Sequence, residues 1–144
     1  MTSTARGLTV LELLTWFGIF MIACAVSTPS LVKLLDAYHL RGAARLVYAE
    51  MQSLRISAVA TNTRYRSDVD SGALRLGRFD LETGAWEDIG ATPRELSAVD
   101  VASSGEILFA PNGTAPSPGT ITLTNQNGAQ MTVVVSSAGM VRIH

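Results

Sequence analysis

The segment Arg6-Gly7-Leu8-Thr9-Val10-Leu11-Glu12-Leu13-Leu14 joins a short polar leader to the longest apolar run of the chain. A single carboxylate, Glu12, lies inside that run. An ionised side chain at membrane depth costs about 3 kcal/mol even on the mild translocon scale, so Glu12 is a candidate functional residue that requires a charged partner. Taken alone, Glu12 also fits a simpler interpretation, an acid near a helix end that reaches the membrane interface.

The apolar run over residues 13–32 has the length of a membrane-spanning helix. About 20 predominantly apolar residues are needed to cross a bilayer, and Pro29 lies near the far end of this run. A cleaved secretory signal peptide is the alternative, because small residues around Ala25 follow the apolar core. Arg6 is the only positive charge before the run, however, and Glu12 would interrupt its apolar region. We therefore expect a single membrane span.

The basic residue, the glycine and the glutamate resemble the class III signal of type IV pilins and type II secretion pseudopilins. In that family a prepilin peptidase cuts after the glycine, and the new N-terminal residue is methylated. The resemblance implies cleavage between Gly7 and Leu8 and N-methylation of Leu8, where the family most often has Phe. Pro29 lies where many pilins carry a proline in the N-terminal helix, and it is expected to kink that helix.

The same resemblance implies that Glu12 acts in assembly. Its carboxylate is expected to pair with the N-terminal cation of a neighbouring subunit and so to set the axial register of the filament. Recognition by the peptidase alone is the alternative role. The implied partners are prepilin peptidase, other major and minor pilins or pseudopilins, and the inner-membrane assembly platform. The implied location is the bacterial inner membrane, with a periplasmic C-terminal domain, and then the pilus or pseudopilus.

Helical periodicity continues beyond the apolar run without a linker. Asn62, followed by β-branched and charged residues, is expected to end this helix, which predicts one helix of about fifty residues. The expected organisation is a leader at residues 1–7, a transmembrane and assembly helix at 8–32, and a periplasmic domain at 33–144. One stripe of the helix is apolar at three- and four-residue steps: Leu40, Ala43, Ala44, Val47, Met51, Leu54 and Ala58.

After the helix the sequence changes to short β-branched or alternating segments separated by turn formers. This pattern predicts an α+β fold, in which the long N-terminal helix packs on a C-terminal antiparallel β-sheet domain. Residues 110–119 are expected to form a loop because they contain three of the five prolines. No motif marks residues 67–104, so their strand order is not predicted. The strand candidates are residues 73–79, 85–89, 99–101, 106–109, 120–124, 130–136 and 141–143.

Three later segments resemble the GspH/FimT group of minor pseudopilins. The first is the helix end Leu54-Arg55-Ile56-Ser57-Ala58-Val59-Ala60-Thr61-Asn62, the second is Phe109-Ala110-Pro111-Asn112-Gly113, and the third is Ser137-Ala138-Gly139-Met140-Val141-Arg142. The resemblance implies a structural minor pilin or pseudopilin near the tip of a type II secretion pseudopilus or type IV pilus. A membrane-anchored periplasmic binding module is an alternative.

The composition gives little support to catalysis or to metal binding. Cys24 is the only cysteine, so no intramolecular disulfide is possible. His39 and His144 do not form a catalytic or metal-binding group with neighbouring acids in the sequence, and Asp68 and Asp70 resemble a calcium loop only faintly. We expect no enzymatic activity, no cofactor and no metal site.

DNA binding in natural transformation is the main alternative function. FimT-like relatives bind DNA through a basic Gly-Arg-x-Arg motif, and the matching positions here read Gly139-Met140-Val141-Arg142, so one arginine is absent. The affinity for DNA depends on the number of phosphates neutralised, and the formal net charge of the chain is only −1. Arg142 is therefore a possible but weak DNA-binding residue. A second basic patch would require four arginines to lie together: Arg64, Arg66, Arg75 and Arg78.

Overall fold

The computed structural model describes residues 9–91, 96 and 99–144, except for the side chains of residues 25–32 and 91. The chain forms two compact units, Met1–Leu35 and Asp36–His144. Pro29 lies among the residues whose side chains are outside the described part of the structure, so its expected kink stays a prediction. Gly7 and Leu8 lie outside the described residues altogether. Across the described residues, no helical stretch is both long and apolar enough to cross a membrane.

Helix α1 spans Val10–Thr61, which confirms the expected single long helix. It ends where the sequence predicts, because Asn62 adopts a left-handed backbone conformation with φ of 52°. This conformation allows the Thr63 amide to donate to the Ala58 carbonyl oxygen at 3.2 Å, which satisfies one of the carbonyl groups that a helix end leaves free.

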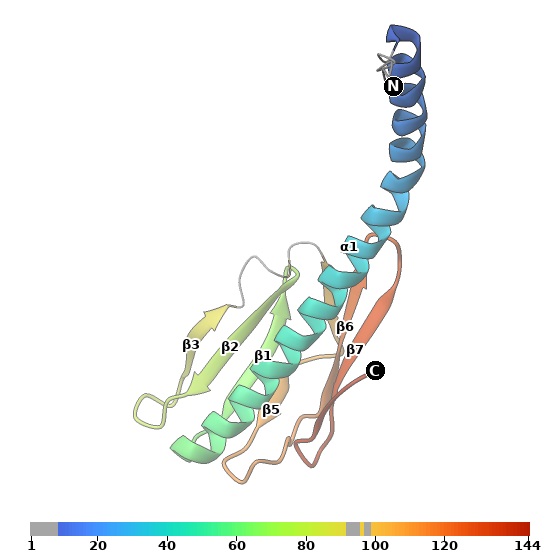
Figure 1. Cartoon of the computed structure of the whole chain (residues 1–144). Helices are drawn as coiled ribbons and strands as arrows, with labels where there is room; N and C mark the ends of the chain where they lie inside the picture. Colours follow the sequence, from blue (N-terminus) through green and yellow to red (C-terminus); the bar gives the residue numbers. More distant parts are fainter. Residues whose placement is uncertain (1–8, 92–95, 97–98) are drawn as a thin grey trace, which may run out of the picture. The chain divides into compact units, whose positions relative to one another are not determined.

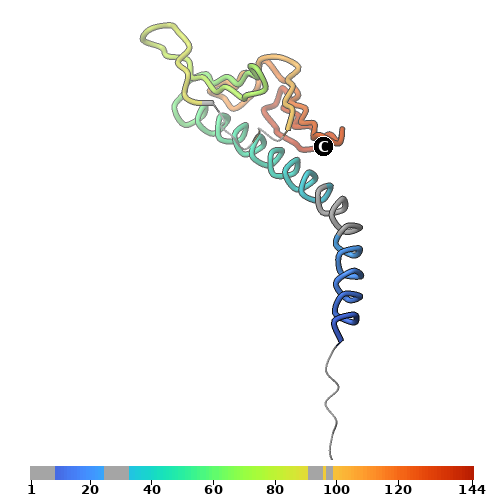
Figure 2. Tube along the Cα trace, turned by 90° about the horizontal axis from the view of Figure 1, so that it is seen from above, coloured from blue at the N-terminus to red at the C-terminus, as the bar shows by residue number. Residues whose placement is uncertain are grey.

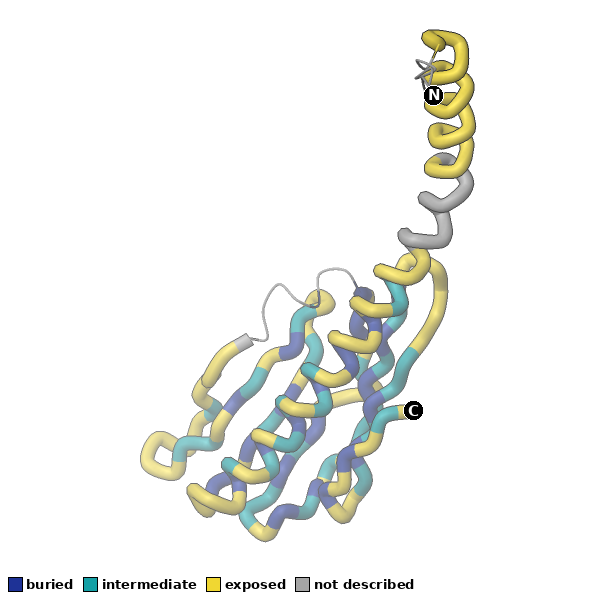
Figure 3. Tube along the Cα trace, viewed as in Figure 1, coloured by how far each residue is buried: buried dark blue, intermediate teal, exposed yellow. Residues whose placement is uncertain are grey.

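The apolar stripe of α1 packs against the strands, as the periodicity predicts. All seven stripe residues are buried, and Ala44, Val47, Met51 and Ala58 have no measurable exposure. Figure 3 shows exposed and more buried positions alternating along this half of the helix. Most of the α1 side chains on the opposite face remain exposed or half-buried.

Eight strands form two antiparallel four-stranded sheets (Figure 1). The first sheet has the order β3-β2-β1-β5, and the second has the order β4-β6-β7-β8. Seen from above in Figure 2, the second half of α1 lies along one side of the strand layer. The strands are β1 (Tyr65–Asp70), β2 (Ala73–Phe79), β3 (Trp86–Ala91), β4 (Val99–Ser103), β5 (Ile107–Phe109), β6 (Gly119–Asn125), β7 (Gln130–Val135) and β8 (Val141–Ile143).

The core lies between the helix stripe and the inward faces of both sheets. The burial of β6 alternates along its second half, so Ile121 and Leu123 face the core while Thr122 and Thr124 are only half-buried. The Asn127 side chain donates to the Asp36 carboxylate at 2.5 Å, so the β6–β7 turn is also attached to the start of the second unit. Further fully buried side chains come from both sheets: Leu74, Ile107, Phe109, Val133 and Val135.

One strand was not expected from the sequence. Residues 65–70 form β1, whose central position in the first sheet makes it a partner of both β2 and β5. Its inward residue Ser67 is 1 % exposed, and its hydroxyl donates to the Met51 sulfur at 3.5 Å. A buried serine at an inward position interrupts the apolar alternation by which strands are recognised.

The other strands confirm their predicted locations, with ends that shift by up to two residues. Ser117 forms an isolated bridge with Leu108, so the expected loop at 110–119 is pinned near its end. Asp68 and Asp70 lie on β1 instead of in a calcium loop, and Asp70 forms an ion pair with Arg75 at 2.8 Å.

Candidate functional site

The first candidate site lies at the start of α1, around Glu12. The structure places Glu12 in the first helical turn with an exposed side chain. Thr9 caps this turn, because its hydroxyl oxygen accepts from the Glu12 amide at 3.3 Å and its carbonyl oxygen accepts from the Leu13 amide at 3.1 Å. Thr9 and Glu12 therefore have the spacing of a capping box, which stabilises a helix N-terminus. The Thr-x-x-Glu spacing was visible in the sequence but its capping role was not inferred.

The first turns of α1, before and after Glu12, expose a wide apolar surface. Exposed apolar areas of this extent mark contacts with other proteins or with membranes. The side chains that remain more than half exposed are Val10, Leu11, Leu13, Leu14, Trp16, Phe17, Ile19, Phe20, Met21 and Ile22.

The second candidate site is formed where the three GspH/FimT-like segments meet, at the far end of α1. The Arg55 side chain donates through Nε to the Gly113 carbonyl oxygen at 3.0 Å. The amide of Ala115, two residues after the second segment, donates to the Ser137 carbonyl oxygen at 3.0 Å and so ties this part of the chain to the third segment. Segments that resemble one family therefore lie together although they are far apart in the chain.

Glycine is required in this contact. A Cβ atom at Gly139 would lie 2.0 Å from the Gly113 carbonyl oxygen and 3.2 Å from Arg55 Nε. Gly139 also has φ of 74°, in a turn where its amide donates to the Ser136 carbonyl oxygen at 2.8 Å. The sequence marked these glycines only by resemblance, and the structure gives the reason: the backbone of the third segment touches the backbone of the second.

Arg142, the candidate DNA-binding residue, lies on β8 with an exposed side chain. Its guanidinium contacts the Met140 sulfur at 3.8 Å. Met140, which replaces the missing arginine of the motif, is itself 48 % exposed. The structure therefore keeps one basic and one apolar side chain side by side at this position.

The four arginines of the possible second basic patch do not form an uncompensated positive surface. Three of them form ion pairs: Arg66 with Glu106 at 3.3 Å, Arg75 with Asp70 at 2.8 Å, and Arg78 with Glu87 at 2.6 Å. The hydrogen bond to Glu87 raises the pKa of Arg78 further above its ordinary value. Neighbouring carboxylates would repel phosphate groups at these positions.

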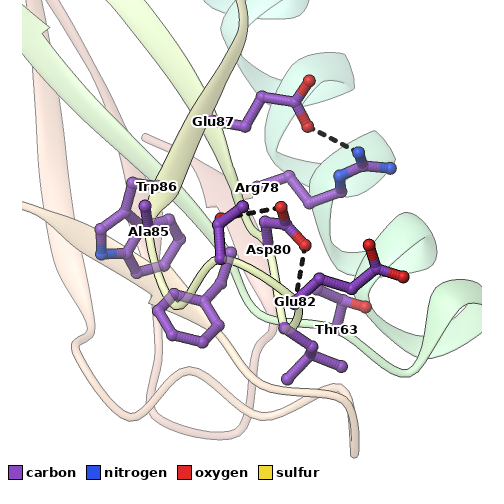
Figure 4. Close-up of a pocket in the computed structure, with 10 residues that line it drawn as sticks. Thr63, Arg78, Asp80, Glu82, Ala85, Trp86 and Glu87 are labelled. Atoms are coloured by element: carbon purple, nitrogen blue, oxygen red, sulfur yellow. Dashed lines mark hydrogen bonds and ion pairs between the residues drawn. The ribbon is translucent and has the colours of Figure 1, made fainter.

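A shallow hollow of about 640 Å³ lies beside the β2–β3 loop (Figure 4). The Trp86 ring packs edge-on against Phe79 at 5.3 Å, and Arg66 lies over the same ring at 4.8 Å. The Asp80 carboxylate accepts from the Glu82 amide at 2.9 Å and from the Thr83 hydroxyl at 2.8 Å. These hydrogen bonds, with the Glu82 amide as the larger cause, lower the pKa of Asp80.

The polar side chains that line the hollow stabilise the β2–β3 loop, and they do not form a clear ligand-binding site. Of the three carboxylates that line the hollow, those of Asp80 and Glu87 already have partners, so they are not free to receive a ligand. Within the described residues, no group of three or more His, Cys, Asp or Glu side chains is placed to hold a metal ion.

Solved structures of minor pilins and pseudopilins share this fold. The minor pseudopilin EpsH from the type 2 secretion system of Vibrio cholerae aligns with a TM-score of 0.62 and 15% identity, over 74% of this chain and 96% of that one. The type IV minor pilin FimU of Pseudomonas aeruginosa aligns with a TM-score of 0.60 and 17% identity, over 77% of this chain and 92% of that one. No curated protein matches the chain.

The family assignment comes from the sequence of the second unit. Residues 43–139 match the family described as type II transport protein GspH, and this range covers more than half of the chain. It includes the helix stripe from Ala43 onward, the arginine at the end of α1 and both glycines of the contact between segments. The chain therefore belongs to the GspH family of type II transport proteins.

Proposed function

We propose that this chain is a non-enzymatic structural minor pilin or pseudopilin, cleaved after Gly7 and assembled near the tip of a type II secretion pseudopilus or type IV pilus. The observation that carries the proposal is the match of residues 43–139 to the GspH family. The pilin-like fold supports it, since EpsH is a minor pseudopilin and FimU is a type IV minor pilin. Prepilin peptidase, the assembly platform and other pilin-like subunits are the proposed partners.

The start of α1 supports a role in the membrane and in assembly. Large apolar side chains from Val10 to Ile22 are exposed in the isolated chain, so they need lipid or neighbouring helices to cover them. The Glu12 carboxylate lies in the first turn, where the positive end of the helix dipole favours an anion. In the proposed assembly, the N-terminal amine of a neighbouring subunit completes the compensation of this charge in lipid.

Substitutions at the two ends of this segment test the proposal. Gly7→Val should block leader removal, because the scissile bond requires a small and flexible backbone. Glu12→Ala should be cleaved but excluded from fibres, because the charge pair matters only where subunits meet in lipid. Immunoblots for leader removal, combined with sheared-fibre fractions, measure the two steps separately.

Two further variants separate the charge of Glu12 from its place in the capping box. Glu12→Gln keeps a side chain suited to the third helical position but removes the charge, so it should fail to assemble as Glu12→Ala does. Thr9→Ala removes the capping hydroxyl and should still assemble. Normal fibre entry of cleaved Glu12→Gln protein would contradict the assembly role of the charge.

No specific observation favours either alternative function, DNA binding or a periplasmic binding module. Met140 replaces one arginine of the DNA-binding motif, and three of the four arginines of the possible second basic patch are paired with carboxylates. The hollow beside the β2–β3 loop has its carboxylates at Asp80 and Glu87 already engaged. The structural role therefore stands as the proposed function.

A further inference from the structure

The second half of α1 carries a regular exposed face in addition to its buried stripe. Steps of four and three residues alternate along this face from residue 38 to residue 59, which is the spacing of a helix that packs along a second helix. With 3.6 residues per turn, these positions lie on the side of α1 away from the apolar stripe. We call this face the outer seam and define it by seven residues: Tyr38, Gly42, Arg45, Ala49, Gln52, Ile56 and Val59.

The described part of the second unit leaves the outer seam uncovered. The strand layer lies along one side of this half of α1 (Figure 2), and six of the seven seam residues are exposed, while Gln52 is half-buried. Tyr38 is 75% exposed, Ile56 is 65% exposed and Val59 is 53% exposed. Helix positions that face water are usually charged or polar, so large apolar side chains at both ends of one seam indicate a surface for a partner.

The far end of the outer seam has the form of a socket for one side chain. A hollow of about 330 Å³ is lined there by Gln52, Arg55, Ile56, Val59 and Ala60. The first four of these residues occupy positions i, i+3, i+4 and i+7, the arrangement that receives one side chain of a facing helix in a knobs-into-holes contact. The Gly113 carbonyl oxygen holds the Arg55 side chain, so one wall of the hollow is fixed before a partner binds.

Gly42 is the position where a facing helix can approach most closely. A glycine inside a helix destabilises it relative to alanine, and a Cβ atom at Gly42 would meet nothing within 4 Å. The fold of the domain therefore does not require glycine at this position. Small residues allow two helix backbones to come close together, and Ala49, one heptad later on the outer seam, is also small.

The charge of the outer seam distinguishes between possible partners. Arg45 lies in the seam and Arg41 lies one turn before it, and both are exposed. Like charges four residues apart repel each other on a helix, and the ion pairs among the described residues involve other arginines: Arg66, Arg75 and Arg78. Two copies of this chain at the same depth in a membrane would place Arg45 against Arg45. The seam therefore disfavours a second copy and favours a helix with a carboxylate at this level.

We propose that the outer seam docks the N-terminal helix of a different pilin-like subunit, which places a carboxylate against Arg45 and an aliphatic side chain in the hollow beside Ile56. The inference rests on the proposed function, under which both helices start in the same membrane and run parallel. It adds the kind of partner, a subunit whose helix is acidic where this helix is basic. Phosphate groups of DNA would neutralise Arg45 but leave the apolar ends of the seam uncovered.

Site-specific photo-cross-linking of the full chain, in cells that assemble the fibre, tests where the partner binds. The chain carries benzoylphenylalanine at position 56, and the probes are the tagged pilin-like subunits of the same cells. The expected product joins position 56 to the N-terminal helix of one such subunit. An Asp or Glu should lie about three turns before the captured residue, since Arg45 lies that far before Ile56. The control position is Gln126, exposed in the turn between β6 and β7, which should not capture this helix.

Charge exchange tests the chemistry of the contact. Arg45→Glu should lower the yield of the cross-link at position 56 by about tenfold or more, because two carboxylates then face each other. Arg64→Glu is the matched control, since Arg64 is exposed and lies after the helix, so the same change of charge there should leave the yield unchanged. Replacing the facing acid of the captured subunit by arginine should restore the yield with Arg45→Glu and lower it with native Arg45.

Gly42→Leu tests the close approach of the two helices. The larger side chain should not lower the thermal stability of the full chain in detergent, because a Cβ at this position meets nothing within 4 Å and leucine favours a helix. It should nevertheless abolish the cross-link at position 56. An unchanged yield would contradict close helix packing at the outer seam.

Three further results would overturn the inference. They are a second copy of this chain, DNA or lipid alone as the main product at position 56, a captured helix without an acid at the expected level, and an equal loss of yield with Arg45→Glu and Arg64→Glu. Leader removal and fibre entry are scored in the same cells. A chain that is cleaved and enters fibres without the expected cross-link refutes this contact and leaves the proposed function standing, whereas a chain that is neither cleaved nor found in fibres refutes the proposed function.

Discussion

A Cβ atom at Gly139 would lie 2.0 Å from the Gly113 carbonyl oxygen, and the residue has φ of 74°. The left-handed conformation costs an alanine about 1 to 2 kcal/mol, and overpacking against backbone adds about 1 to 3 kcal/mol. We expect Gly139→Ala to lower the free energy of unfolding by about 2 to 5 kcal/mol through these two effects. Chemical denaturation measures the difference.

Gly128→Ala is the matched control for this substitution. Gly128 has φ of 76°, but a Cβ there would meet nothing within 4 Å. Only the backbone strain applies, so the expected loss is about 1 to 2 kcal/mol. Equal losses for the two variants would show that the contact between Gly139 and Gly113 adds nothing to stability.

For single residues, the sequence indicates which positions matter better than it indicates why they matter. Gly113 and Gly139 lie in segments that resemble the GspH/FimT group, but the carbonyl contact between them joins distant parts of the chain and leaves no local signal. The opposite holds for Glu12. Thr9, three residues earlier, caps the helix through the Glu12 amide, and this cap could be inferred from local spacing alone.

Helix α1 offers a direct comparison of buried and exposed apolar side chains. Leu54 is 3% exposed in the stripe against the sheets, whereas Ile56, two residues later, is 65% exposed. Removing Met1 to about Val32 should leave a soluble and folded domain, because the stripe that covers the sheets begins at Leu40. In that protein, Leu54→Ala should lower the free energy of unfolding by about 2 to 5 kcal/mol.

Ile56→Ala is the control on the same helix, and it should change the free energy of unfolding by less than about 0.5 kcal/mol. Denaturant titrations of both variants give the comparison. Leu54→Ala should create a cavity if Leu54 faces the core. A loss well under 1 kcal/mol would therefore mean that the stripe does not face the core.

The elements of this fold differ in how far the sequence reveals them. The helix is predictable because its stripe repeats over many turns, and all seven expected stripe residues are buried. Strand β1 was missed because its buried Ser67 bonds to Met51 instead of providing an apolar side chain. The division into two sheets was also not predicted, since the pairing of β1 with β5 depends on contacts between segments about forty residues apart.

The charge distribution of the whole molecule bears on the choice between the structural role and DNA binding. The chain has 11 basic and 12 acidic residues, and ion pairs neutralise Arg66, Arg75 and Arg78. Non-specific affinity for DNA depends on the number of phosphates that basic side chains neutralise, and it falls steeply as salt rises. The three GspH/FimT-like segments contain only two basic residues, Arg55 and Arg142, so these segments provide very few such contacts.

We therefore expect the truncated domain to show only weak, salt-sensitive attraction to duplex DNA and no mobility shift at near-physiological salt. Arg142→Ala should change the affinity for DNA only slightly, because Met140 already interrupts the motif that would make Arg142 part of a basic pair.

Met140→Arg restores the second arginine of the motif and is the matched variant for comparison. It should strengthen binding at low salt and make the dependence of affinity on salt steeper by about one phosphate contact. A titration at two salt concentrations measures both quantities. A clear shift of the unmodified domain at near-physiological salt, lost in Arg142→Ala, would favour a DNA receptor over a structural subunit.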